Sequence, residues 1–303
     1  MSQTWLRRAI SENAPLLFVL LWSTGFIGAK YGLPYAPPYT LLFLRFVLTL
    51  TLLGLLLATL RPTLPVGWRQ RGHLMVSGLL VHGAYLGGVF SAIKLGMSAS
   101  LCALVVGAQP LLTAIAAPYV LGERIGRIQW LGTVFGFVGL YLVLGAQAGT
   151  TIDMASPAMV AALAALGGIT AGTLYQKKYC ADNDVLGIAL FQYLPTTLLF
   201  AVAALLFETT ASVVVSYPLV LSILWLAIGL SLGAIGLLSY LLRQRAAYRV
   251  STLFYLVPAV TALEAFVLFN ETLTPAQLVG MAIVAAAVYL VTRSPATRPN
   301  PLD

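Results

Sequence analysis

Charge is scarce in this sequence. Only 9% of its 303 residues are Asp, Glu, Lys or Arg, whereas a soluble domain carries about 25%. Hydrophobic residues make up 60%, and the mean hydropathy is +0.93. So few charged side chains cannot cover the surface of a soluble protein of this length. The composition therefore excludes an ordinary soluble domain and indicates that lipid surrounds most of the chain.

Cysteine and histidine are also scarce, with two of each. Cys102 lies in an apolar run and Cys180 follows a pair of lysines, so neither a disulfide framework nor a metal site is predicted. The chain has no H-E-x-x-H sequence and no Walker motif. We therefore predict that the protein is not an enzyme, uses no metal or other cofactor, and does not use ATP directly.

Ten apolar runs predict membrane-spanning helices. In hydrocarbon each run must satisfy its own backbone hydrogen bonds, which favours helix. The predicted fold class is thus an all-α integral membrane protein. The spans run roughly over Ala14 to Leu33, Tyr39 to Leu60, Leu74 to Leu95, Ser98 to Leu121, Ile128 to Ala146, Pro157 to Tyr175, Val185 to Phe207, Leu219 to Leu242, Leu253 to Phe269 and Pro275 to Val291.

The loops differ in charge. If the N-terminus is cytoplasmic, the charged residues of the loops on the outer side of the membrane are all acidic, namely Asp153, Glu208 and Glu271. The positive-inside rule then predicts that both termini are cytoplasmic, and it explains most of the +8 net charge without a nucleic-acid partner. The cations on the inner side are Arg7, Arg8, Arg61, Arg69, Arg71, Arg124, Arg127, Lys177, Lys178, Arg243, Arg245, Arg249, Arg293 and Arg298.

The chain also repeats itself. A shift of 148 residues matches spans four and five with spans nine and ten, and it pairs Pro110 with Pro258 and Glu123 with Glu271. Five spans per half place the second half upside down in the membrane. The sequence therefore predicts two inverted five-helix repeats, residues 1–148 and 149–303, with a substrate site between them near the membrane midplane.

Five short segments together resemble a known family. The chain is similar to the EamA-type permeases of the drug/metabolite transporter superfamily over nearly its whole length. This resemblance implies a ten-span exporter of small metabolites in the bacterial inner membrane, with a cavity bounded by spans one, three, four, six, eight and nine. Asn270 and Glu264 depart from the family pattern, which has Gly and an apolar residue there. The segments are Trp22-Ser23-Thr24-Gly25-Phe26 with Lys30, Arg45, Gln109-Pro110 with Gly122-Glu123-Arg124, Phe254-Tyr255-Leu256-Val257-Pro258, and Asn270-Glu271-Thr272-Leu273.

Four ionisable side chains lie in the outer halves of the spans: Lys30, Arg45, Lys94 and Glu264. Such residues are rare in membranes and are usually paired or functional. We expect a charged cluster below the outer mouth, in which Glu264 either locks one conformation as a salt bridge or couples transport to protons or cations. Arg45 is expected to pair with a backbone carbonyl or with Glu264. Lys30 and Lys94 either snorkel to the interface or face the cavity, where they would favour a carboxylate substrate.

Uncharged candidates for the cavity wall are mostly aromatic. His82 and Tyr85 share one face of their helix, and aromatic rings with a polar atom suit a partly apolar solute. The alternative for all of them is packing and hydrogen bonding between helices. The candidate substrate-binding residues are Trp22, Lys30, His82, Tyr85, Gln109, Tyr175, Tyr240 and Tyr255.

Pro110 and Pro258 form a symmetric pair of prolines. Proline removes a helix hydrogen bond, and paired interruptions mark a site between repeats, although a purely structural kink is the alternative.

These features favour a secondary transporter that exports an amino acid or a related metabolite by alternating access. One alternative is a proton antiporter for drugs or cationic compounds, and another is a membrane scaffold or sensor that transports nothing. The expected partners are a small solute and the lipid bilayer. The sequence sets no oligomeric state, and a monomer is compatible with it.

Overall fold

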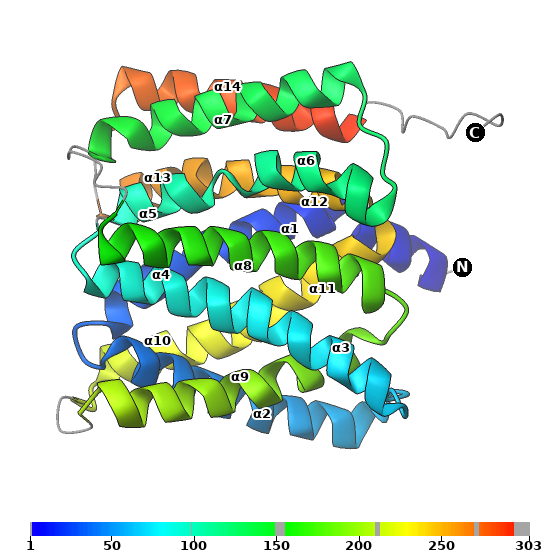
Figure 1. The fold of residues 1–303 in the computed structure, drawn as a ribbon, viewed down its shortest axis with the longest axis vertical. Coiled ribbons are helices and arrows are strands. Elements are labelled where there is room, and N and C mark those ends of the chain that lie inside the picture. Colours follow the sequence, from blue (N-terminus) through cyan, green and yellow to red (C-terminus); the bar gives the residue numbers. More distant parts are fainter. Residues whose placement is uncertain (1, 98, 149–154, 210–212, 270–272, 294–303) are drawn as a thin grey trace.

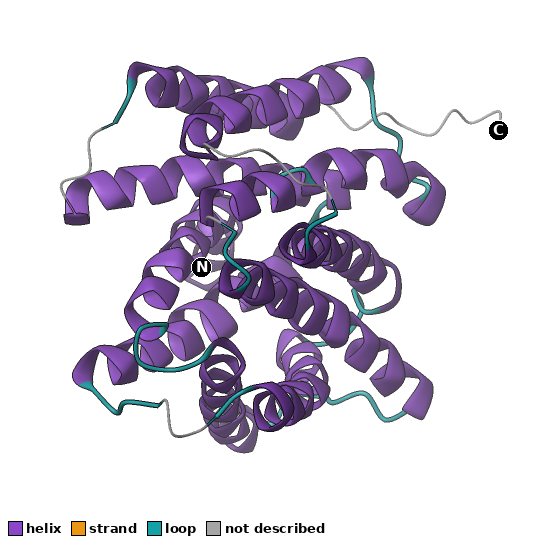
Figure 2. Ribbon diagram, turned by 60° about the vertical axis from the view of Figure 1, so that its left-hand side comes forward, coloured by secondary structure: helices purple, strands orange, loops and turns teal. Residues whose placement is uncertain are grey.

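The computed structural model describes residues 2–97, 99–148, 155–209, 213–269 and 273–293, and every regular element in these ranges is helical. The helices form one bundle (Figures 1 and 2). They are α1 (Ser2–Gly32), α2 (Pro38–Leu60), α3 (Trp68–Gly78), η1 (Leu79–Ala84), α4 (Tyr85–Lys94), α5 (Ala99–Val106), α6 (Gln109–Leu121), α7 (Arg127–Ala148), α8 (Pro157–Tyr179), α9 (Val185–Phe207), α10 (Tyr217–Trp225), η3 (Leu226–Ala234), α11 (Ile235–Gln244), α12 (Ala247–Thr252), η4 (Leu253–Tyr255), α13 (Leu256–Phe269) and α14 (Pro275–Arg293).

Eight helical stretches in the described residues are long and apolar enough to cross a membrane, in agreement with a multi-pass membrane protein. The other two predicted spans, the first and the ninth, also fall on helices. In α1 the apolar stretch is Asn13–Gly25, and the ninth span consists of η4 followed by the 14 residues of α13.

The helix pairs have a regular order. Figure 1 shows α7 beside α14 along one side of the bundle and α2 beside α9 along the opposite side, and the two helices of each pair are in contact. Between these pairs, α1 packs on α10 and η3, while α8 packs on α4 and η1. When the ten predicted spans are numbered in order, span five contacts span ten, span two contacts span seven, span one contacts span eight, and span three contacts span six. Exchanging each span of the first half with the span five places later leaves the first two contacts unchanged and converts the last two into each other.

Two π-helical segments interrupt long helices. In η1 the backbone is wound more loosely between α3 and α4, and in η3 it is wound in the same way between α10 and α11. The shift of 148 residues carries η1 onto residues 227–232, which lie within η3. π-Helical turns are rare and often occur at functional sites. The two segments therefore indicate a candidate functional region in the middle of the bundle.

The two ends of the bundle differ in charge. The first turn of α1, the last turn of α14, and the connections after α2, α6, α8 and α11 all lie at one end (Figure 1). We call this end the basic face, because its exposed residues include Arg61, Arg69, Arg124, Lys178 and Arg243. The other end, which includes the C-terminal end of α4 and Glu208 after α9, is called the opposite face.

Candidate functional site

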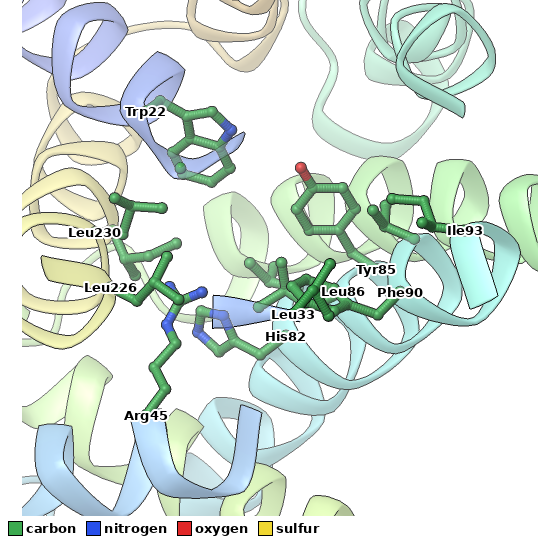
Figure 3. A pocket seen from close by; sticks show the side chains of 14 residues that line it. Trp22, Leu33, Arg45, His82, Tyr85, Leu86, Phe90, Ile93, Leu226 and Leu230 are labelled. Carbon is green, nitrogen blue, oxygen red and sulfur yellow. The ribbon is translucent and has the colours of Figure 1, made fainter. Parts of the chain in front are cut away.

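A hollow, here called the central cavity, lies in the middle of the bundle (Figure 3). Its empty volume, including the part that is open to solvent, is about 690 Å³. On α4 its lining continues to Ile93, so the cavity extends from the middle of the bundle toward the opposite face. It is lined by Trp22, Gly25, Leu33, Arg45, Val81, His82, Tyr85, Leu86, Val89, Phe90, Ile93, Leu226, Leu230 and Ile235.

Aromatic rings form one wall of the central cavity. Trp22 on α1 and Tyr85 on α4 face each other with their ring planes at 21° and their centroids 6.4 Å apart. Phe254 packs edge-on against Trp22 at 5.0 Å. Trp22 and Tyr85 also line an adjoining hollow, whose empty volume is about 500 Å³ and whose wall includes Phe254 and Pro258. Trp22 and Tyr85, two candidate residues of the first predicted half, thus lie together beside Phe254 of the second half.

Arg45 reaches the cavity from α2. Its guanidinium lies beside His82 and below Leu226 and Leu230 (Figure 3), although the residue is only 3% exposed. Arg45 Nε donates to Ser231 Oγ at 2.8 Å. The expected bond from Arg45 to Glu264 or to a backbone carbonyl is not formed in the described part of the chain, because the hydroxyl of Ser231 in η3 takes this place.

His82 lies in η1 and is fully buried beside Arg45. Its ring stacks on Tyr193 with centroids 4.8 Å apart. Its Nε2 is 3.3 Å from Gln192 Oε1. Since an amide oxygen can only accept, His82 Nε2 is the donor, and Nδ1 is left without a hydrogen-bond partner among the described residues. His82 is thus among the residues that line the central cavity, together with Tyr85.

The remaining members of the predicted charged cluster have other partners. Lys94 Nζ is 3.9 Å from Glu208, and Glu208 in turn accepts hydrogen bonds from the backbone N–H groups of Tyr39 and Thr40 at the start of α2. Glu264 Oε1 is 2.7 Å from Ser23 Oγ. Arg45, Lys94 and Glu264 therefore do not pair with one another. The first turn of α2 offers free N–H groups and a positive dipole end, which attract the carboxylate of Glu208. The side chain of Lys30 lies outside the described residues.

Buried polar side chains lie between the central cavity and the basic face. Gln109 Nε2 donates to Ser251 Oγ at 3.1 Å, and Gln176 Nε2 donates to Ser239 Oγ at 2.9 Å. Gln192 Nε2 in turn donates to Gln176 Oε1 at 3.1 Å. Gln109 thus lies among buried polar residues on α6, α8 and α12 and is not among the lining of the central cavity.

Three predicted tyrosines lie away from the central cavity. The hydroxyl of Tyr175 is 2.6 Å from His73 Nδ1, near the basic face. The buried ring of Tyr255 packs on Gly136 of α7, and Tyr240 is partly buried in α11. None of the three is among the residues that line the cavity in the described structure. Because a tyrosine in a span carries no signal for the face it occupies, the sequence did not distinguish them from Tyr85.

Pro110 and Pro258 each follow a break in a helix. Pro110 is in the first turn of α6, after the turn that separates α6 from α5. Pro258 is in the first turn of α13, after the 3-10 segment η4. Proline is tolerated in a first turn because the N–H that it lacks has no helical partner there.

Several cavity residues were missed by the sequence reasoning. Leu226, Leu230 and Phe90 form apolar wall, and apolar residues in membrane helices carry no distinguishing signal. Ser231, which holds Arg45, was missed as well. It stands in Gly229-Leu230-Ser231-Leu232-Gly233, which has the G-x-S-x-G spacing of a nucleophile elbow. Here the segment is π-helical and Ser231 Oγ binds Arg45 and Leu226 O, so the strand and turn that an elbow needs are lacking.

Glu123 connects the predicted halves at the basic face. Gly122, with φ +67°, ends α6 in the left-handed conformation that glycine favours, and the following carboxylate accepts from the N–H of Ala247 at 2.7 Å and from that of Tyr248 at 3.3 Å. Burial raises the pKa of Glu123 above its ordinary value of 4.5, and the two N–H groups with Lys177 and Arg249 partly offset this effect.

This raised pKa predicts a specific dependence of stability on pH. The folded protein holds the Glu123 proton more tightly than the unfolded chain does, so this contribution to stability is complete below pH 4.5 and is lost as pH rises through the folded value. The melting temperature of the wild type in detergent should therefore rise relative to that of Glu123→Gln as the pH is lowered from 8 to 4. Asp182→Asn, at an exposed acid on the same face, is the control. A constant difference between wild type and Glu123→Gln would contradict the prediction.

A bundle of membrane-length helices around a central cavity is the architecture of a multi-pass membrane transporter. Residues 14–145 and 155–293 match the model of the EamA-like transporter family, and the chain belongs to this family. It is therefore a transporter and not an enzyme, as predicted.

Two bacterial relatives resemble the chain over most of its length. A probable amino-acid metabolite efflux pump of Salmonella typhimurium is 30% identical, with 91% of this chain and 92% of the relative covered. A protein of the same name from Escherichia coli is 28% identical with the same coverage. A crystal structure of a protein with 25% identity superposes with a TM-score of 0.77 and covers 92% of this chain and 95% of its own.

Proposed function

We propose that the protein is a secondary transporter that exports a small metabolite, an amino acid or a related compound, from the bacterial cytoplasm across the inner membrane. The observation that carries this proposal is the central cavity, whose lining combines aromatic Trp22 and Tyr85 with the cation Arg45. The names of the two bacterial relatives support export and amino-acid metabolites as substrates. The lining is mostly apolar, which suits a solute with an apolar side chain.

The proposed architecture is ten spans in two inverted repeats, residues 1–148 and 149–303. The family matches over 14–145 and 155–293 support this division, as do the exchangeable helix contacts and the positions of η1 and η3. The cations at one end of the bundle support cytoplasmic termini. In this orientation the basic face is inside, and the central cavity extends toward the outside.

The proposed transport cycle is alternating access. In the present conformation the buried hydrogen bonds of Gln109 and Gln176 lie on the inner side of the cavity. Such bonds between membrane helices are individually weak, at about 0.6 kcal/mol, so they can be exchanged for water when the inner side opens. Trp22, His82 and Tyr85 are the proposed substrate-binding residues. Pro110 and Pro258 begin the helices that follow the two breaks, and we propose that these breaks allow the helices to tilt.

Transport by purified protein in liposomes tests this function. We expect saturable movement of at least one labelled amino acid from a panel that also contains cationic drugs. Replacing Tyr85 by alanine should raise KM, because a ring is lost from the cavity wall, whereas Tyr119→Ala, at an 88% exposed ring on α6, should leave KM unchanged.

Other outcomes point to the other candidate functions. Movement of cationic drugs without amino acids would favour a drug antiporter. If no solute of the panel moves, with or without a pH gradient, the exporter proposal is rejected and a scaffold or sensor is favoured.

A further inference from the structure

Arg45 is a buried cation without a buried anion. It is only 3% exposed, and its single hydrogen bond in the described structure joins Nε to a neutral hydroxyl, Ser231 Oγ, at 2.8 Å. A guanidinium has five N–H donors, so four of them have no partner among the described residues. A buried charge without a counterion is costly, which raises the question of what anion completes this site.

The acidic side chains of the described structure are committed elsewhere. Glu208 binds the start of α2, Glu123 binds the start of α12, and Glu264 lies against Ser23. Asp182 and Asp184 lie in the connection after α8, at the basic face. No acidic residue is found among the described residues that line the central cavity. Among the described residues no anion balances Arg45, so a bound solute is the candidate source of one.

The guanidinium is held in place and points into the cavity. Ser231 fixes Nε, Tyr193 donates to the backbone oxygen of the same residue at 2.7 Å, and the Phe46 ring lies 5.3 Å from Arg45 Cζ. Figure 3 shows the free edge of the guanidinium next to His82 and beneath the space between Trp22 and Tyr85. A planar fork in this position matches the two oxygens of a carboxylate.

Resting on the proposed export function, we infer that Arg45 binds the carboxylate of the solute and that the acidic group is the polar feature the cavity recognises. The apolar part of the solute then lies between Trp22, Tyr85 and Phe90 toward the opposite face. A single guanidinium matches one negative charge, so a carboxylate fits better than a phosphate dianion. An ammonium group finds no carboxylate in the described lining, so an α-amino group contributes little to binding.

A matched ligand series tests this inference. Binding to full-length protein in detergent is measured by calorimetry for L-phenylalanine, 3-phenylpropanoate, phenylalaninamide and 2-phenylethylphosphonate. The two carboxylates should bind the wild type with similar affinity. The amide should bind roughly 10- to 100-fold more weakly, which is the range expected for a hydrogen-bonded charge pair. Tighter binding of the phosphonate would overturn the carboxylate assignment in favour of a dianion.

Variants of Arg45 show whether this side chain reads the anion. In Arg45→Met the preference for acid over amide should disappear, while Arg45→Lys should keep part of it, because the charge remains and the fork is lost. Lys94→Met is the control, because it removes another cation of the first half, whose partner is Glu208. This variant should keep the preference for acid over amide. If Arg45→Met folds poorly, Arg45→Lys and the wild-type series still decide the question.

The failures of the two proposals can be told apart. Wild-type protein that transports amino acids but binds phenylalaninamide as well as phenylalanine overturns the role of Arg45 alone. The same holds if a folded Arg45→Met or Arg45→Lys variant keeps the full preference for the acid. Wild-type protein that neither transports nor binds any member of the panel overturns the export function itself.

Discussion

Replacing Gly78 by alanine is expected to destabilise the protein by about 3 kcal/mol, at the upper end of the range for overpacked cores. A Cβ atom at Gly78 would lie against the Cα of Gln192 and 2.5 Å from its carbonyl oxygen. Both are backbone atoms of α9, so no side chain can rotate away, and α3 and α9 must separate. Melting temperature in detergent and the monodisperse fraction on size-exclusion chromatography measure the effect.

The control for this prediction is Gly167→Ala in α8, where an added Cβ has no neighbour within 4 Å. Alanine favours helix over glycine by about 1 kcal/mol, so Gly167→Ala should be neutral or slightly stabilising. Equal losses in the two variants would show that the close contact at Gly78 does not matter.

The position of Gly78 connects packing to the candidate site. Gln192, against which it packs, holds His82 through Oε1 and donates to Ser77 and Gln176 through Nε2. A shift of α9 would therefore also move the partner of a cavity residue. Surviving Gly78→Ala protein should show weaker solute binding than the Gly167→Ala control.

Much of the fold could be predicted because lipid imposes simple rules. Apolar runs between turn residues gave helices at nearly the observed places; for example, the runs Val185 to Phe207 and Leu253 to Phe269 end where α9 and α13 end. The spacing of His82 and Tyr85 predicted that the two share a helix face, and both line the central cavity. These predictions depend only on periodicity and hydrophobicity, which are local properties of the sequence.

The partners of the polar residues could not be predicted in the same way. A buried Arg45 requires some partner, but whether that partner is Glu264, a carbonyl or Ser231 depends on the rotation of α2 against η3. The π-helical winding of η3 changes this rotation, and nothing in its composition distinguishes the segment from an α-helix. Tyr255 lies away from the described lining of the central cavity, because after the break at η4 its ring packs on Gly136 of α7.

The two ends of the cavity differ in the contacts that close them. Toward the opposite face its lining is apolar side chains such as Leu33, Phe90 and Ile93, which form no hydrogen bonds that would have to break as a solute leaves. Toward the basic face, polar side chains such as Gln109 and Gln176 are bonded across helices. Opening the inner side therefore needs water to replace these bonds, and a bound solute or a proton can shift that balance.

Glu264 is our candidate for the proton site, and its contact with Ser23 explains why. Ser23 Oγ is 2.8 Å from Leu20 O and 2.7 Å from Glu264 Oε1, yet a hydroxyl has only one proton to donate. Both contacts are hydrogen bonds at the same time if Ser23 donates to Leu20 O while a protonated Glu264 donates to Ser23 Oγ.

Loss of the Glu264 proton would leave two acceptors facing each other or force Ser23 to release Leu20 O. Ser23 lies next to Trp22 of the cavity wall, and α1 packs on α13 at this contact, so protonation here can bias the position of α1 relative to the second half. Glu264 Oε2 is buried and has no hydrogen-bond partner among the described residues.

Glu264→Gln is therefore expected to abolish transport that is driven by a pH gradient, while exchange of labelled for unlabelled solute without a gradient continues. Glutamine can donate to Ser23 as the protonated acid does, so the packing is kept but the proton cannot leave. The measurement is uptake into liposomes with and without a gradient, and Ser23→Ala is the companion variant. Since it keeps the carboxyl group, Ser23→Ala should retain a response to the gradient with a shifted pH dependence. Glu264→Gln protein whose gradient-driven transport equals that of the wild type would rule out this residue as the coupling site, and its bond to Ser23 would then be a structural contact between α1 and α13.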